Sequence, residues 1–395
     1  MLSKPCLKCM TQNSTADPII MTNLHISCAF DGGNIVVHDA KDASNIRLAI
    51  RPDNNSQFFQ WFYYRVSGAK GQPLRMVLEN AKDAAFTGGW EGYRACASYD
   101  RETWFRVDST SYVNGQLIIE HTPDIDSVYY AYFAPYSMER HADVVAEAAL
   151  HSDVSLRVLG QTVQGQDMDC LSIGTGEKII WVIARQHPGE TMAEWWMEGF
   201  LTRLLDDEDD VSMALRSKAT FHIIPNMCPD GGRNGNLRTN QTGANLNREW
   251  GVATIQSAPE VYHTIKAMDE AKPDLCLDVH GDEALPYNFI AGAEGIPGYT
   301  QKQADNFAAF LSAYKTASPD FQTEHGYPQT APGKGNLTMC TNYTAHAYDC
   351  LAMTLEMPFK DNANAPDAEF GWSPDRSADL GAAVLDAMLA LVDEL

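Results

Sequence analysis

The first third of the chain alternates short apolar runs with turn residues. Runs of strand length and composition include NIVVHDA (34–40), FFQWFYYRV (58–66), QLIIEHT (116–122) and VYYAYFAP (128–135). Turn sequences such as DGGN separate the runs, and no long helical period intervenes. Many short strands at this spacing predict an antiparallel β-sandwich, which we place at residues 23–135.

From Tyr136 onward the pattern changes to an alternation of strands and helices. Buried strands are predicted at KIIWVIA (178–184), TFHIIPNM (220–227), DLCLDVHG (274–281) and LAMTLEMPF (351–359). Amphipathic helical patterns lie between them, and SADLGAAVLDAMLALVDEL closes the chain as a helix. This alternation predicts an α/β domain over residues 136–395, with a mixed sheet flanked by helices.

The overall charge narrows the range of partners. The 395 residues carry a formal net charge of −23, which repels nucleic acid and anionic membranes, so neither is expected as a partner. Residues 1–22 lack the apolar core of a signal peptide, and no apolar run reaches the length of a membrane span. We therefore expect a cytoplasmic protein with a flexible tail at 1–22. Cys6 and Cys9 form a CxxC pair in that tail, interpreted as metal-free, with redox or metal capture as the alternative.

A candidate metal site follows the strand at 178–184. His187 and Glu190 are three residues apart around a Pro-Gly turn, which can direct both side chains toward one cation. His280 ends a second predicted strand and supplies a third donor. A catalytic zinc typically takes three protein ligands of these kinds and leaves one position open. Ligands collect at the carboxyl ends of strands in such sheets, and Glu356 also lies near a strand end.

A long polar segment at 224–250 is the second candidate functional region. It is rich in Gly and Asn, so we expect an ordered loop rather than a helix. Arginines alternate with asparagines in it, an arrangement that suits recognition of carboxylates and of charge developing on an oxygen. The alternative interpretation is a solvated polar loop.

Five stretches together resemble the zinc metallocarboxypeptidases of the funnel-shaped α/β type, and most closely the cytosolic carboxypeptidase branch. They are HPGE (187–190), NMCPDGG (226–232), GNLRTNQTGANLNRE (235–249), DVHG (278–281) and TLEMPF (354–359), in family order. The sandwich, including SYDRETWFRV at 98–107, is also similar to that branch. The resemblance implies a carboxypeptidase-like mixed sheet in the second domain.

The resemblance also implies a role for individual residues. One zinc ion per chain would be bound by His187, Glu190 and His280. Glu356 matches the catalytic glutamate, and Arg238 matches the arginine that polarises the scissile carbonyl. Asn247 and Arg248 match the pair that binds the terminal carboxylate of the substrate, which would be the C-terminus of a peptide or protein. The sequence leaves the oligomeric state open.

The chemistry is consistent with these roles. Amide hydrolysis needs a nucleophilic water, and zinc lowers the pKa of water to about 7. A carboxylate such as Glu356 can accept the proton and return it to the leaving amine. Arg238 can stabilise the oxyanion, a contribution of roughly 3–4 kcal/mol for one such donor. A clamp for a terminal carboxylate favours exopeptidase action, because an internal peptide bond offers no anion there.

Three features depart from the family pattern. Asn245 stands where many relatives have Asp, so a zinc-bound His would be oriented less strongly. Asp278 is adjacent, but we expect it to point to the opposite face of its strand. The substrate-binding tyrosine has two candidates, Tyr343 and Tyr348. Residues 335–355 contain no Lys or Arg, which favours a neutral or apolar C-terminal residue in the substrate.

Two further functions remain open from the sequence. A zinc amidohydrolase on the same scaffold, such as an N-acyl amino acid deacylase or a murein-peptide amidase, would use the same metal ligands. An inactive module that binds C-terminal tails would keep the clamp without the chemistry. The carboxylate clamp and the sandwich favour the carboxypeptidase.

Overall fold

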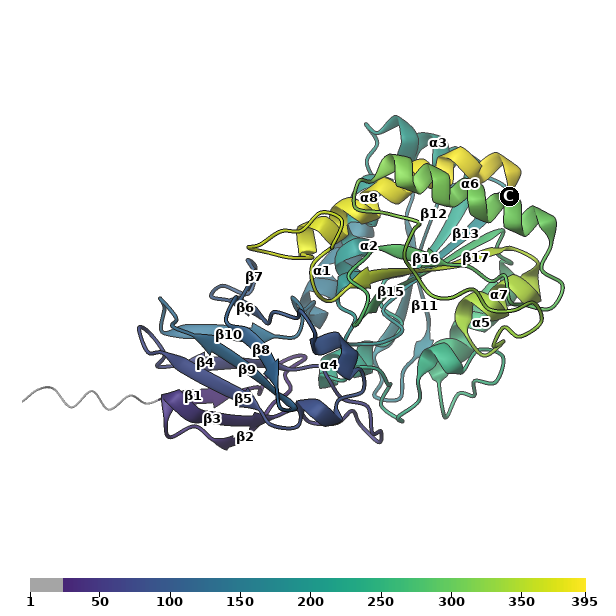
Figure 1. Ribbon diagram of the computed structural model, residues 1–395. Helices are drawn as coiled ribbons and strands as arrows, with labels where there is room; N and C mark the ends of the chain where they lie inside the picture. The colour runs from purple at the N-terminus through teal and green to yellow at the C-terminus, as the bar shows by residue number, and fades with distance from the viewer. Residues whose placement is uncertain (1–23) are drawn as a thin grey trace, which may run out of the picture.

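The computed structural model describes residues 24–395, and the predicted tail with its CxxC pair lies outside them. The chain forms two sheets of five strands and one of seven. In Figure 1 the five-stranded sheets stack on each other in purple and blue, apart from the larger layered part in teal to yellow. No helix within residues 24–395 combines the length and the apolar character that crossing a membrane requires.

Alternating apolar residues build the sandwich. Its first sheet has the order β1 (His25–Ser27), β4 (Tyr63–Ser67), β10 (Ser127–Ala131), β6 (Cys96–Ser98) and β7 (Phe105–Arg106). Its second sheet has the order β2 (Val36–Asp39), β3 (Ile46–Ala49), β5 (Leu74–Leu78), β9 (Gln116–His121) and β8 (Thr110–Val113). Tyr64 of the first sheet reaches Met76 of the second, and both are fully buried. The core therefore lies between the two sheets.

The sandwich is antiparallel except for one pair of strands. β3 and β5 are parallel, with Ile46 opposite Met76. The chain leaves β3 for β4 in the other sheet and then returns to β5, so β3 and β5 run in the same direction. The apolar runs in the sequence predicted the strands, but they did not predict this crossover between the two sheets.

The seven-stranded sheet is mixed, which confirms the α/β prediction. Its order is β11 (Ser155–Gln161), β12 (Asp167–Ile173), β14 (Ala219–Ile224), β13 (Lys178–Ala184), β15 (Leu275–Asp282), β17 (Leu351–Pro358) and β16 (Phe289–Ala291). The four central strands are parallel to one another. β12 and β16 flank them in antiparallel orientation, and β11 pairs antiparallel with β12, so it runs in the same direction as the central strands. The hairpin of β11 and β12 is an addition to the elements predicted from the sequence.

Helices cover both faces of this sheet (Figure 1). They are α1 (Met138–Ala148), α2 (Met192–Leu204), α3 (Asp210–Lys218), α4 (Pro229–Asn234), α5 (Pro259–Glu270), α6 (Gln301–Ala317), α7 (Cys340–Tyr348) and α8 (Pro374–Leu391). Alternate residues of β13 enter two cores: Ile180 and Val182 join the side of α2 and α8, whereas Trp181 and Ile183 join the side of α5 and α7. This is the period of two expected of a strand buried on both faces.

The polar segment 224–250 contains a short helix, contrary to the prediction of a continuous loop. Helix α4 begins at Pro229, whose fixed φ suits the first position of a helix. It ends at Gly235, which adopts a left-handed conformation with φ of 70°. The remainder of the segment is irregular apart from one 3-10 turn at Leu246–Arg248.

Candidate metal centre and active site

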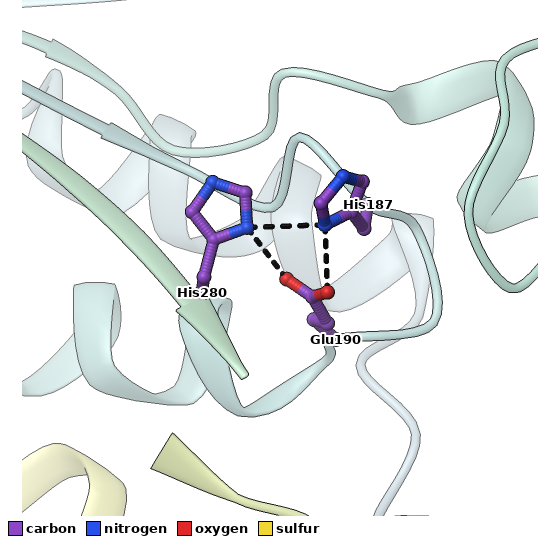
Figure 2. A group of neighbouring side chains, drawn as sticks. All are labelled: His187, Glu190 and His280. Atoms are coloured by element: carbon purple, nitrogen blue, oxygen red, sulfur yellow. Dashed lines mark hydrogen bonds and ion pairs between the residues drawn. The ribbon is translucent and has the colours of Figure 1, made fainter. Parts of the chain in front are cut away.

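Three side chains converge beside the carboxyl ends of the central strands. Figure 2 shows His187, Glu190 and His280 pointing toward one another. His187 Nδ1 lies 2.7 Å from Glu190 Oε1, His280 Nδ1 lies 2.8 Å from Glu190 Oε2, and the two Nδ1 atoms are 3.1 Å apart. All three residues are buried, and one ligand atom from each falls within 4.8 Å of the others.

A strained turn delivers the first two of these residues. Arg185, directly after β13, has a left-handed backbone with φ of 59°, which is rare for a residue with a side chain. Its buried guanidinium holds this turn by donating to Glu194 and to the carbonyl of Pro188 at 2.8 Å. Such strain persists only where surrounding contacts fix it, and it is frequent at functional sites.

The outer nitrogen of each imidazole has an oxygen partner. His187 Nε2 donates to Asn245 Oδ1 at 3.0 Å, and His280 Nε2 lies 2.9 Å from Asp278 Oδ2. The expectation that Asp278 points to the opposite face is wrong, because residues two apart on a strand share a face. Gln186 also donates to Asp278 at 2.6 Å. These contacts turn both Nδ1 atoms inward.

Buried charges set the protonation of the cluster. Burial and the nearby Arg238 lower the pKa of His187 to about 4. Burial would also lower the pKa of His280, but the carboxylates of Asp278 and Glu190 raise it well above the ordinary value. Burial raises the pKa of Glu190, but the two imidazoles outweigh this and bring it below its usual range.

This donor set fits zinc. Two imidazole nitrogens and one carboxylate, with the outer nitrogens held by oxygen atoms, match the ligands and supporting contacts of catalytic zinc sites. A proton and a metal ion compete for the same Nδ1 atoms, so binding would release the proton from His280.

Glu356 lies directly beside this cluster. β15 and β17 are in register, with His280 opposite Glu356, and strand alternation places both on the face toward α5 and α7. Burial raises the pKa of Glu356 well above its usual value. Within residues 24–395, its Oε2 atom has no hydrogen-bond partner.

A tyrosine that the sequence analysis missed contacts Glu356. The Tyr327 hydroxyl lies 3.1 Å from Glu356 Oε1 and donates to Asp282 Oδ2 at 2.7 Å. The two predicted tyrosines lie elsewhere: Tyr348 donates to Asp269 at 3.0 Å, and Tyr343 contacts Tyr348. In the sequence, Tyr327 lies between a glycine and a proline in the irregular segment before α7, and this was the feature that could have indicated it.

Arg238 lies next to Glu190, one of the three candidate metal ligands. One guanidinium nitrogen is 3.8 Å from Glu190 Oε1, and the guanidinium lies over the ring of Phe86, 4.9 Å from its centroid. Three successive backbone N–H groups, from Leu237 to Thr239, donate to Asp53 of the sandwich.

Asn247 and Arg248 are the two residues predicted to bind the terminal carboxylate of a substrate. Asn247 Oδ1 accepts from the backbone N–H of Cys340 at 2.8 Å, which leaves its NH2 group free to donate. Arg248 is held by a hydrogen bond of 2.5 Å to the carbonyl of Asn247. Among the described residues no carboxylate forms an ion pair with Arg248, so its charge is available to an anion. Burial and the charge of Arg238 lower the pKa of Arg248.

Asn247 and Glu356 also line a cavity of about 280 Å³. Its walls come from the segments 289–295 and 322–330, together with α6 and α7. The cavity is therefore bordered both by Asn247, a candidate ligand for the substrate carboxylate, and by Glu356, the candidate general base.

Comparison with known proteins identifies the family. Residues 26–133 match the model of the cytosolic carboxypeptidase N-terminal domain, and residues 143–370 match the model of the zinc carboxypeptidases. The chain belongs to the zinc carboxypeptidase family. The resemblance inferred from the sequence is thus confirmed, and so is the class of enzyme: a metallocarboxypeptidase.

Individual relatives of this carboxypeptidase agree. An uncharacterised protein of Zymomonas mobilis is 50% identical over 94% of this chain and 97% of its own. The solved metallo-carboxypeptidase of Pseudomonas aeruginosa is 45% identical, with a TM-score of 0.92 over 94% of this chain and 99% of its own. Cytosolic carboxypeptidase 2 of Xenopus tropicalis is 28% identical over 68% of this chain, which spans about a third (32%) of that longer relative.

Proposed function

We propose that this carboxypeptidase binds one zinc ion through His187, Glu190 and His280 and removes the C-terminal residue of peptides or proteins in the cytoplasm. The observation that supports this best is the convergence of three donors near Glu356, the residue that pairs with His280 in the register of β15 and β17. The relatives named cytosolic carboxypeptidases support the location.

Each remaining residue has a separate task in the proposed reaction. Zinc, when bound, supplies Lewis acidity toward water and a carbonyl oxygen. Glu356 accepts a proton from the attacking water and returns it to the leaving amine. The guanidinium of Arg238 faces the oxygen that becomes negative in the tetrahedral intermediate and stabilises it.

The clamp supplies the exopeptidase selectivity. The NH2 of Asn247 and the guanidinium of Arg248, which forms no ion pair within residues 24–395, bind the terminal carboxylate of the substrate. Binding there places the last peptide bond over Glu356, which provides the orientation that catalysis requires. The Pseudomonas aeruginosa relative was solved with (2-guanidinoethylmercapto)succinic acid, a ligand that carries carboxylates, which supports a carboxylate site.

A pair of peptides tests this function. The two peptides share one sequence and differ only in a free or an amidated C-terminus. The zinc-loaded protein should cleave the free acid and leave the amide intact. Equal cleavage of both peptides would favour the zinc amidohydrolase over the carboxypeptidase.

A variant of the clamp extends the test. Arg248→Ala should raise KM for the free acid by about 10–100-fold, because losing a hydrogen bond to a charged group costs roughly 1.5–3 kcal/mol. Arg233 lies in the same polar segment but is exposed, and among the described residues its side chain donates only to Gln166, at 3.3 Å, so Arg233→Ala is the matched control. Equal effects of the two variants would contradict the clamp.

A further inference from the structure

The β-sandwich forms many hydrogen bonds with the segment of the second domain that carries Arg238. Residues of the sandwich donate hydrogen bonds to main-chain oxygens at the end of α4 and in the loop that follows it, between residues 233 and 241. Gly32 N–H donates to the carbonyl of Arg233 at 3.0 Å, Arg51 to Asn234 at 2.8 Å, Asn34 to Gly235 at 2.8 Å and Asn55 to Gln241 at 3.0 Å. Within residues 24–395 this loop pairs with no strand, so these partners supply hydrogen bonds that a sheet would otherwise provide.

Asp53 makes the most concentrated of these contacts. Its carboxylate is 4% exposed and accepts the N–H groups of Leu237, Arg238 and Thr239 at 2.6, 2.7 and 3.0 Å. The Thr239 hydroxyl adds a fourth contact at 3.2 Å. Successive N–H groups converge on one anion only when the backbone curves around it, so the carboxylate fixes the curvature at Arg238.

The sandwich also contacts the side chain of Arg238. Phe86 and Phe58 place their rings 4.9 and 5.9 Å from the guanidinium carbon. An aromatic face attracts a cation without taking up its N–H donors. The guanidinium is therefore held in place while its hydrogen-bonding groups remain available.

We propose that Asp53 is a positioning residue for catalysis, and that the sandwich completes the active site by fixing Arg238. The inference rests on the proposed role of Arg238 as the group that stabilises the oxyanion. Asp53 holds the backbone of Arg238 and has none of the roles proposed for the reacting groups, so its proposed effect is indirect and the sandwich is a part of the catalytic unit.

A double-mutant cycle tests this role. Asp53→Ala should lower kcat by about 10–100-fold and leave KM within about twofold, since small displacements of a catalytic group cost up to about 100-fold. Asp53→Asn, which keeps the shape and one acceptor oxygen, should retain intermediate activity and serves if the alanine variant fails to fold. The control is Asp42→Ala: Asp42 is an exposed sandwich carboxylate that caps only the turn at Ala43–Asn45.

The combined variants distinguish positioning from general stability. Adding Asp53→Asn to Arg238→Ala should cause no further loss of kcat, because the group that Asp53 positions is already gone. Multiplied losses would overturn the inference, and so would a fall in Tm with unchanged kcat. Wild-type kcat in Arg238→Ala would instead overturn the proposed role of Arg238, and this inference with it.

A second inference comes from the cavity beside Glu356. Asn247 stands at its edge, and Phe289, Phe307 and Leu311 form apolar wall. The lining includes no Lys or Arg, and its two carboxylates are Glu356 and Glu294. With the terminal carboxylate at Asn247 and the peptide bond at Glu356, the side chain of the last residue extends into this cavity.

Glu294 lines this cavity with its carboxylate uncompensated by any residue that the structure describes. It is half-buried, and in the part of the chain that the structure describes it forms neither an ion pair nor a hydrogen bond through its side chain. Its Oε2 lies over Gly292, where a β-carbon would approach to 2.8 Å, so the glycine leaves the space that the carboxylate uses. A partly desolvated carboxylate favours a cation nearby and repels a second anion.

From this geometry we infer that Glu294 selects substrates ending in Lys or Arg. This inference deepens the proposed function and rests on it. It replaces the neutral preference expected from residues 335–355, because that expectation did not include the segment 289–295. The net charge of −23 also attracts basic peptides over longer distances.

Four peptides that differ only in a last residue of Lys, Arg, Leu or Glu test the inference. The wild type should show the highest kcat/KM with Lys and Arg. Glu294→Gln should lower kcat/KM for these two by about 10–100-fold, the range for losing a contact between opposite charges, and leave Leu within about twofold. Asp305→Asn removes an exposed carboxylate on α6 that bonds only Gln301, and serves as the control.

The possible outcomes distinguish a failure of the role of Glu294 from a failure of the proposed carboxypeptidase activity. Faster cleavage after Leu than after Lys, or an equal loss with all peptides in Glu294→Gln, would overturn the role of Glu294 alone. If none of the four peptides is cleaved, the proposed function and this inference fail together.

Discussion

The hydroxyl of Tyr327 lies between two carboxylates, 3.1 Å from Glu356 and 2.7 Å from Asp282. A hydroxyl carries a single proton, so it can donate fully to one oxygen while it accepts from, or only weakly contacts, the other. Which carboxylate receives the proton of Tyr327 thus depends on whether Glu356 is itself protonated. The residue is 48% exposed, so Tyr327 is in contact with solvent as well as with the two carboxylates.

We expect Tyr327→Phe to impair the reaction without harming the fold. Removing the hydroxyl removes a contact to a charged group, worth roughly 1.5–3 kcal/mol, so kcat/KM should fall by about 10–100-fold. Unfolding in urea and zinc content should match those of the wild type. Tyr343→Phe is the matched control, because Tyr343 contacts Trp250 and Tyr348 rather than Glu356. Equal activity of the two variants would assign Tyr327 no part in catalysis.

Glu356→Gln should separate catalysis from metal binding. The amide keeps the shape of the side chain but cannot accept a proton, and loss of a general base typically lowers kcat by about 10²–10⁴-fold. Zinc measured by mass spectrometry should stay at one ion per chain. His187→Ala should instead lose most of the zinc. A Glu356→Gln variant with near wild-type kcat would refute the base, and full zinc in His187→Ala would refute the ligand.

Asn245→Asp should strengthen zinc binding. The amide oxygen of Asn245 accepts from His187 Nε2 at 3.0 Å. A carboxylate in its place would make the other ring nitrogen of His187 a stronger ligand for zinc. Affinity should rise by about 10-fold, at the low end of the range for such supporting contacts. Competition with a chromophoric chelator measures it, and Asn245→Ala should shift the affinity the other way. Weaker binding by the Asp variant would show that the amide already provides the best partner.

His141 should make the stability of the fold depend on pH. Burial lowers its pKa, but contacts with Asp169 at 3.7 Å and Glu194 at 2.8 Å outweigh this and raise it to about 9. The pKa is about 6.5 in an unfolded chain, so the stabilisation is complete below that pH and is lost as the pH rises through 9.

Urea unfolding at pH 6 and pH 9.5 measures this loss. It should be about 3 kcal/mol at most, from 1.36 kcal/mol for each pKa unit. His141→Gln, which cannot be protonated, should flatten the dependence on pH. An unchanged slope in that variant would assign the dependence to other groups.

Local patterns in the sequence determined the main elements of the fold. The period of two in β13 and β15 follows from apolar residues that the sheet buries on both faces, so these strands could be predicted directly. The Pro-Gly turn after β13 likewise indicated that His187 and Glu190 share a site, because neighbours in sequence are held close by the chain itself. His280 was added to that site because side chains at the carboxyl ends of neighbouring parallel strands meet at one edge of a sheet.

Contacts between distant segments were decided only by the tertiary structure. Tyr327 reaches Glu356 from an irregular segment, where no period reports the direction of a side chain. Asp53 meets Arg238 across 185 positions of the chain, and Glu294 enters the cavity from a loop that sequence reasoning did not associate with it. The sequence alone determined which groups could do the chemistry, because donor type is a property of the residue. Their partners depend on how two domains and several loops meet in space.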